Sequence, residues 1–255
     1  TYTTDSTNDA VWGTLATQTT TGQSLKKGVV TGDYITTANV DLDWGTILDT
    51  TTDGKSYTKN GNLSGEYTTL STNDDVWGTL EDQTTTGKSY LRNINTITSE
   101  YTTTVVGFDL DWGIITQTST ATNSFHRGQA NGSSTAIADF DDIWGIQNKS
   151  TTTGQSLYRN AVVSSQYTTT VNFDADWGIA TESDSEGENF GRNGAVTGSY
   201  DTHGTYEEWG DQITSVTDGE SKDKWTGKKT GTYHTEAEFD LGVQIASNTT
   251  GTSLD

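Results

Sequence analysis

Acidic residues recur in pairs at one point of a repeated pattern, and paired carboxylates are the groups of this chain best suited to binding a cation. Three pairs are spaced two residues apart, namely Asp41/Asp43, Asp109/Asp111 and Asp174/Asp176. On a strand, two such carboxylates share a face, and calcium prefers six to eight oxygen ligands. The pairs therefore predict a calcium site. The alternative is that these aspartates only solvate the outer surface.

Catalysis has little support in the sequence. His126, His203 and His234 stand at three different points of the repeat and form no metal-ligand spacing. A glycosidase needs two carboxylates in distinct environments, whereas repetition makes the acidic pairs equivalent. We therefore expect a protein that is not an enzyme.

The acidic pairs precede a Trp-Gly step that recurs every 32 to 35 residues. The seven anchors are Trp12, Trp44, Trp77, Trp112, Trp144, Trp177 and Trp209. An eighth copy, "FDLGVQIASNTTGTSL", has Leu241 at the tryptophan position. Copies one, three and five read "DAVW", "DDVW" and "DDIW", copies two, four and six read "DLDW", "DLDW" and "DADW", and copies seven and eight keep the even-type acid before the tryptophan position. The eight copies predict that residues 1–255 form a single repeat domain.

Composition and periodicity predict an all-β fold. Threonine-rich stretches favour strands, glycines in "QTTTG"-like stretches favour turns, and no segment has a sustained helical period. We expect about three short strands in each copy of about 32 residues, one of them over "DDVWGTLED" (Asp74–Asp82). The copies would form a β-solenoid or a stacked antiparallel β-array, and a small-bladed β-propeller is the alternative.

The tryptophans have two interpretations. Apolar residues make up only 29% of the chain, so one large side chain per copy would compensate for a thin core, and we expect a buried tryptophan ladder. The alternative is that they form platforms for sugar rings. Trp225 lies outside the repeat pattern and is the better candidate for an exposed contact.

Charge excludes some classes of partner. The formal net charge of −21 argues against binding nucleic acid, and no apolar run approaches the length needed for membrane insertion. Basic residues gather in "SKDKWTGKKTG", which contains Lys222, Lys224, Lys228 and Lys229. A basic cluster on an acidic chain suits head-to-tail assembly by steering unlike ends together, and a solvated loop is the alternative.

Other features predict export. The chain begins with threonine and contains no methionine, which predicts a processed N-terminus. Four glycosylation sequons, at Asn62, Asn131, Asn148 and Asn248, fit an extracellular or cell-surface glycoprotein.

The leading interpretation is a non-enzymatic extracellular structural protein. Its partner would be itself, in a head-to-tail polymer forming a filament, sheath or surface layer, with Ca²⁺ as the candidate stabilising ion. One alternative is a multivalent carbohydrate-binding lectin whose partners are glycans. Another is a repeat segment of a larger adhesin or phage fibre.

Overall fold

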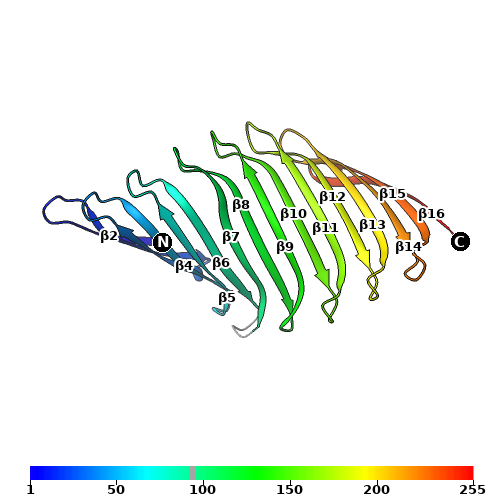
Figure 1. The fold of residues 1–255 in the computed structure, drawn as a ribbon, viewed down its shortest axis with the longest axis horizontal. Coiled ribbons are helices and arrows are strands. Elements are labelled where there is room, and N and C mark those ends of the chain that lie inside the picture. The colour runs from blue at the N-terminus through cyan, green and yellow to red at the C-terminus, as the bar shows by residue number, and fades with distance from the viewer. Residues whose placement is uncertain (92–95, 255) are drawn as a thin grey trace. The chain divides into compact units, whose positions relative to one another are not determined.

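A computed structural model describes residues 1–91 and 96–254, and these residues form sixteen β-strands and no helix (Figure 1). The strands are β1 (Tyr2–Asn8), β2 (Leu15–Lys26), β3 (Val29–Val40), β4 (Ile47–Tyr57), β5 (Leu63–Asn73), β6 (Leu80–Tyr90), β7 (Ile97–Asp109), β8 (Ile114–His126), β9 (Gln129–Phe140), β10 (Gln147–Leu157), β11 (Val163–Phe173), β12 (Ala180–Phe190), β13 (Val196–Tyr206), β14 (Gln212–Lys222), β15 (Lys229–Asp240) and β16 (Val243–Ser253). In the described residues there is thus no helix long and apolar enough to cross a membrane.

The chain divides into two compact units, Thr1–Gln129 and Ala130–Asp255. Unit 1 contains β1 to β8, and unit 2 contains β9 to β16 apart from the first residue of β9. Within each unit, every strand pairs antiparallel with its neighbours in the chain. The predicted all-β fold and the stacked antiparallel array are therefore confirmed.

The number of strands per repeat differs from the prediction. Each copy contributes two strands, nearly all 11 to 13 residues long, and not three short ones. The predicted strand over Asp74–Asp82 is broken, because residues from Asp74 to Gly78 form a turn and β6 begins at Leu80. Since two strands return the chain to its starting direction, odd and even copies have the same orientation. The residue before tryptophan, such as Val76 at 67% exposure, projects from the turn, which explains why it can be apolar or acidic.

Neither unit has a conventional hydrophobic core. The only buried apolar side chains among the described residues are Val40 and Val105, with 6% and 5% of their surfaces exposed. Each unit is a one-layer sheet, so its stability must come largely from backbone pairing and from contacts between side chains of adjacent strands.

Tyrosine and glycine alternate along one line across the strands, which we name the tyrosine–glycine row. Its members are Tyr2, Gly22, Tyr34, Gly54, Tyr67, Gly87 and Tyr101 in unit 1, and Gly154, Tyr167, Gly187, Tyr200, Gly219, Tyr233 and Gly251 in unit 2. Each tyrosine ring of β3, β5, β7, β11, β13 and β15 covers the glycine of the preceding strand. A β-carbon at Gly22, for example, would lie 2.2 Å from Cε1 of Tyr34. Only glycine allows an aromatic ring to pack this closely against the neighbouring backbone.

A second line on the same face consists of hydroxyl side chains, which we name the hydroxyl row. It comprises Thr4, Thr20, Thr36, Thr52, Thr69, Thr85, Thr103 and Thr120 in unit 1, and Thr152, Thr169, Ser185, Thr202, Thr217, Thr235 and Thr249 in unit 2. Cross-strand bonds join members in pairs, as between Thr36 and Thr52, whose Oγ1 atoms are 2.8 Å apart. Such pairs contribute about 0.2–1 kcal/mol each. The high threonine content therefore has a structural explanation.

Candidate functional site

The tryptophans lie in turns, at one end of each strand pair. In the turn between β3 and β4, Asp41 Oδ1 accepts hydrogen bonds from the backbone N–H groups of Asp43 (2.7 Å) and Trp44 (3.0 Å). Gly45 follows with φ of 75°, a left-handed conformation that glycine adopts without strain. The repeated D-x-x-W-G sequence is thus a turn motif in which the aspartate side chain organises the backbone.

The predicted buried tryptophan ladder is wrong. The seven repeat tryptophans are 76–82% exposed, because each of them lies in a turn beyond the strand ends. These are Trp12, Trp44, Trp77, Trp112, Trp144, Trp177 and Trp209. In the first six copies an aspartate side chain caps this turn. Within each unit these tryptophans lie on one turn edge, which we name the tryptophan edge.

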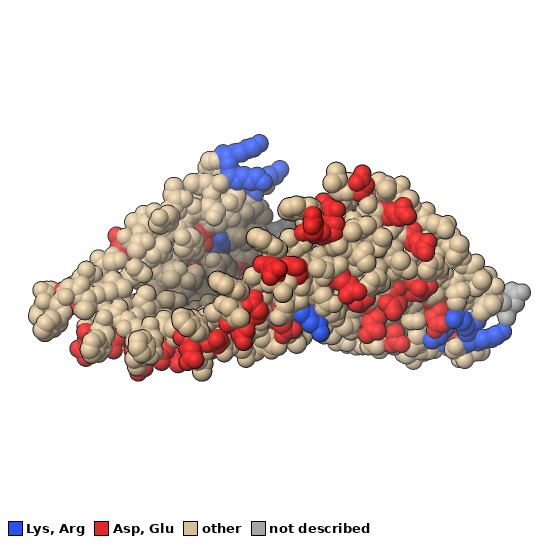
Figure 2. Space-filling view, turned by 90° about the horizontal axis from the view of Figure 1, so that it is seen from above, with Lys and Arg blue, Asp and Glu red and all other residues tan. Residues whose placement is uncertain are grey.

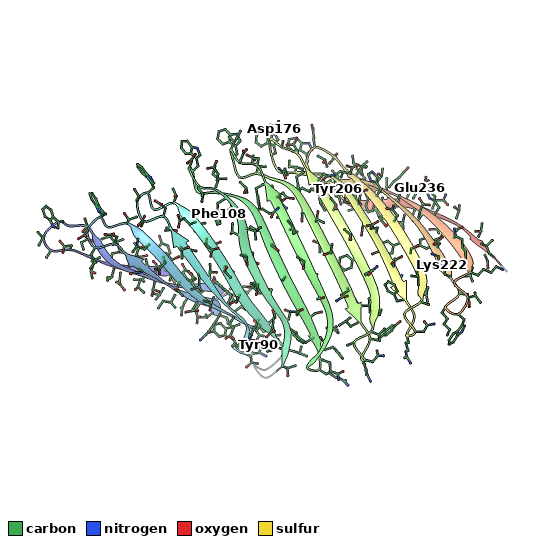
Figure 3. All side chains as sticks on the ribbon, viewed as in Figure 1. Tyr90, Phe108, Asp176, Tyr206, Lys222 and Glu236 are labelled. Atoms are coloured by element: carbon green, nitrogen blue, oxygen red, sulfur yellow. The ribbon has the colours of Figure 1, made fainter. Side chains whose placement is uncertain are left out.

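The acidic pairs share a turn and not a strand face. The first aspartate of each pair accepts hydrogen bonds from backbone N–H groups of its own turn. In the first copy, the hydrogen bond from the Trp12 N–H and then that from the Val11 N–H hold the pKa of Asp9 below its usual value. The second acid of the pairs, Asp43, Asp111 or Asp176, is exposed. Figure 3 shows Asp176 at the turn edge of unit 2. The calcium site stays a prediction, now with turn geometry as its basis.

The opposite turn edge of each unit carries most of its basic residues, and we name it the basic edge. In unit 1 it holds Lys26, Lys27, Lys59 and Arg127, and in unit 2 it holds Arg159, Arg192, Lys222, Lys224, Lys228 and Lys229. In Figure 2, Lys and Arg gather in a few places whereas Asp and Glu spread more widely over the visible face. Meander topology produces this separation, because successive turns alternate between the two edges.

Part of the predicted basic cluster is neutralised within unit 2. Lys222 and Lys229 place their Nζ atoms 2.6 and 2.8 Å from the carboxylate oxygens of Glu220. Hydrogen bonds from Lys222 and then Lys229 lower the pKa of Glu220 to about 2. The Lys224 ammonium lies 5.3 Å from the ring centroid of Trp225, which is 76% exposed. The assembly role of these lysines stays a prediction.

Strand pairing also brings histidines beside acids, which sequence spacing did not reveal. His203 Nδ1 lies 2.8 Å from Asp184 Oδ1, and its Nε2 lies 3.6 Å from Glu182 Oε1. His234 similarly contacts Asp218 and Glu236 at 2.7 and 3.3 Å. The hydrogen bond to Asp184 raises the pKa of His203, and that to Asp218 raises the pKa of His234. Asp184 and Asp218 are one strand away from their histidines in space but 19 and 16 residues away in sequence, whereas Glu236 lies two residues from His234 on the same strand.

The sequons lie on exposed residues. Asn62 belongs to the turn between β4 and β5, and the others lie on strands β9, β10 and β16 as Asn131, Asn148 and Asn248. Glycosylation at these positions stays a prediction.

The two outermost strands differ from all others in their pairing. The order of hydrogen-bonded strands in the described residues begins with β1 and ends with β16, so that within this set β1 has only β2 as its neighbour and β16 has only β15. Every residue of both strands is exposed. Each strand therefore presents a line of backbone N–H and C=O groups without a strand partner in the described part of the chain.

No protein-family model matches the chain, and no curated protein matches it. One similar solved structure is described as a porin-like protein from Bacteroides uniformis ATCC 8492, with 10% identity, covering 80% of this chain and 89% of that chain. The TM-score of this match is 0.17.

Proposed function

We propose that this chain is a non-enzymatic structural protein, the self-assembling subunit of an extracellular filament, sheath or surface layer. The observation that carries the proposal is the pair of open edges on β1 and β16. An exposed strand edge is a template for pairing with another chain, and proteins that remain monomeric usually protect it with charges, proline, bulges or a covering segment.

Such protection is sparse on these two strands. The sequence of β16, "VQIASNTTGTS", contains neither a charged residue nor proline, and β1 contains Asp5 as its single charge. The thin, one-layer construction of each unit also supports assembly, because side chains exposed on both faces can be covered by other subunits. The net charge of −21 would limit nonspecific association of subunits that have not yet assembled.

Electron microscopy and sedimentation of the purified chain test this function. We expect filaments or sheets above a critical concentration in millimolar calcium, and the same sample is then examined in excess chelator. Polymers that dissolve on chelation would support the calcium prediction as well, whereas polymers indifferent to chelator would support assembly alone. Monomers at all concentrations in both conditions would contradict the proposal.

The exposed tryptophans favour a second candidate function, multivalent carbohydrate binding. Aromatic faces stack on pyranose rings, and the tryptophan edge of each unit repeats such a face in every copy except the eighth, with carboxylates nearby. A glycan array tests this candidate. Binding that falls stepwise as Trp44, Trp77 and Trp112 are changed to Ala would support it, and an array without signal would exclude the glycans tested.

A further inference from the structure

The tyrosine–glycine row is incomplete at both of its outer ends. Gly251 on β16 is the row glycine that no tyrosine ring covers: a β-carbon there would meet the Thr232 carbonyl oxygen at 2.9 Å and Tyr233 Cα and Cβ at 3.8 Å, but no ring atom. The six other row glycines would each meet a tyrosine ring carbon at 2.2–2.6 Å.

The opposite deficiency occurs on β1. No strand of the described residues pairs with β1 on the side away from β2, and the Tyr2 side chain is 76% exposed, against 37% for Tyr67 and 40% for Tyr233. Within the row, each tyrosine covers the glycine of the strand before it and not that of the strand after it. Gly22 accordingly is covered by Tyr34, which leaves the ring of Tyr2 without a glycine.

Backbone hydrogen bonding on β1 leaves these same positions open. Thr1 and Gln23 exchange both backbone bonds, at 2.9 and 2.7 Å, so Thr1 and Thr3 direct their N–H and C=O groups toward β2. Because directions alternate along a strand, Tyr2, Thr4 and Ser6 direct theirs toward the open edge.

The same alternation applies to β16. The Leu254 N–H donates to the Thr230 carbonyl at 2.8 Å, which directs even-numbered residues toward β15. Gly251, Thr249 and Ser247 therefore direct their backbone groups outward. The outward sets of β1 and β16 include the row members of both strands, Tyr2 and Thr4 on β1 and Gly251 and Thr249 on β16, so one alignment satisfies both the backbone and the side chains.

We propose that β16 of one copy pairs antiparallel with β1 of a second copy, with Gly251 opposite Tyr2 and Thr249 opposite Thr4. The ring of Tyr2 then covers Gly251, and the tyrosine–glycine and hydroxyl rows continue from subunit to subunit. This inference rests on the proposed function, since it gives the partner and the alignment of the assembly. A contact that joins two different edges repeats from copy to copy, and it produces a filament when the rotation between copies does not close into a ring.

Engineered disulfides test the alignment directly, because the chain contains no cysteine. The predicted pairing places Thr3 opposite Thr250, so the double variant Thr3→Cys, Thr250→Cys should form a ladder of covalent oligomers on mild oxidation. The matched control, Thr3→Cys with Asn248→Cys, is displaced by two residues and should give little cross-linking. Reduction should return both variants to the monomer band.

The outcomes separate this inference from the proposed function. Polymers by microscopy together with a ladder for the 3/250 pair support both. Polymers without that ladder, or with a stronger ladder for the 3/248 pair, overturn the alignment and leave the structural function standing. A cross-link confined to single chains overturns the second copy as the partner. If the chain forms no polymer and the 3/250 variant forms no ladder, the inference and the proposed function are both contradicted.

A second variant tests the aromatic contact without cysteines. Tyr2→Ala should raise the critical concentration about tenfold, because an aromatic contact is lost from every junction. Tyr2→Phe should assemble like the unchanged chain, since the ring covers Gly251 without its hydroxyl. Trp12→Ala removes an equally exposed aromatic residue near the end of the same strand and should have no effect. A critical concentration unchanged in Tyr2→Ala would overturn the contact.

Discussion

Units 1 and 2 share one face and differ on the other. Both carry the tyrosine–glycine and hydroxyl rows on the shared face. On the opposite face of unit 1, charges alternate in sign across strands as Asp33, Lys55, Glu66, Lys88 and Glu100, with Lys88 Nζ 3.4 Å from Glu100. The corresponding face of unit 2 instead has three acids directly opposite one another, Glu186, Asp201 and Asp218, followed by His234.

The comparison separates what maintains the fold from what can vary. The shared face repeats because each tyrosine needs a glycine and each hydroxyl needs a hydroxyl on the adjacent strand. The charged face contributes less, since exposed ion pairs are worth about 0–1 kcal/mol. Differences in response to pH and salt should therefore arise on the charged face, while the shared face should behave alike in both units.

The largest effect should come from filling a row glycine. Gly54→Val and Gly187→Val place a β-carbon 2.2 and 2.5 Å from the Cε1 atoms of Tyr67 and Tyr200, so each ring must leave its site. We expect each variant to lose about 1–3 kcal/mol of unfolding free energy, measured by urea denaturation. Thr51→Val, on the other face of β4, is the control and should change little. A loss in one unit only would contradict the equivalence of the shared face.

A smaller loss should follow removal of a turn aspartate. Asp141 accepts the backbone N–H groups of Trp144 at 2.6 Å, Ile143 at 2.9 Å and Ile146 at 2.8 Å, and its pKa is lowered chiefly by the first. Asp141→Ala should lower the melting temperature and speed amide exchange in that turn, and Asp142→Ala should do neither. Equal effects of the two variants would show that the side-chain hydrogen bonds do not organise the turn.

A pH effect should distinguish unit 2 from unit 1. The pKa of His203 is raised by Asp184 and that of His234 by Asp218, so the folded pKa exceeds the unfolded value near 6.5. This stabilisation is complete below pH 6.5 and is lost as the pH rises through the folded pKa values. Hydrogen exchange, corrected for intrinsic rates, should show that β12 to β15 are better protected at a pH below about 6.5 than at a pH above the folded pKa values of the two histidines. The double variant His203→Gln, His234→Gln should remove this dependence, and its persistence would assign it to other groups.

The smallest effect should be opposite in sign for the two units. Raising salt from about 0.05 M to about 0.5 M screens attraction between the alternating charges of unit 1 and repulsion among the acids of unit 2. We expect amide protection to fall slightly in β3 to β7 and to rise slightly in β12 to β14. Changes of the same sign in both units would mean that the charge arrangement on this face has no local influence.

Much of the fold could be predicted from the sequence, because the repeat appears in every copy. The eight copies, the all-β class, the antiparallel array and the exposure of Trp225 all follow from periodicity and turn residues. The prediction of a strand over Asp74–Asp82 was wrong for a physical reason. The alternation of apolar and polar residues is typical of a strand, but the Asp74 side chain accepts hydrogen bonds from the backbone N–H groups of Val76 and Trp77, and these bonds bend the chain into a turn. That bend moves Trp77 from the expected core to the turn tip.

The candidate site was less accessible from sequence, because it depends on pairing between strands. His203 meets Asp184 only when β13 aligns with β12, and no local spacing indicates that alignment. The recurring tyrosine and glycine positions are the sequence signal that could have predicted how adjacent strands align. Tyr34 follows Gly22 by 12 residues and Tyr67 follows Gly54 by 13, a separation that suits a hairpin with a short turn.

The scarcity of buried apolar side chains has a calorimetric consequence. The heat-capacity increase on unfolding comes mainly from apolar surface that becomes hydrated, and Val40 and Val105 are the only buried apolar side chains described. The increase should therefore fall well below the usual value of about 12–15 cal/mol/K per residue. A small heat-capacity change flattens the dependence of stability on temperature. A sheet built in this way should retain nearly the same free energy of unfolding in cold water as in warm.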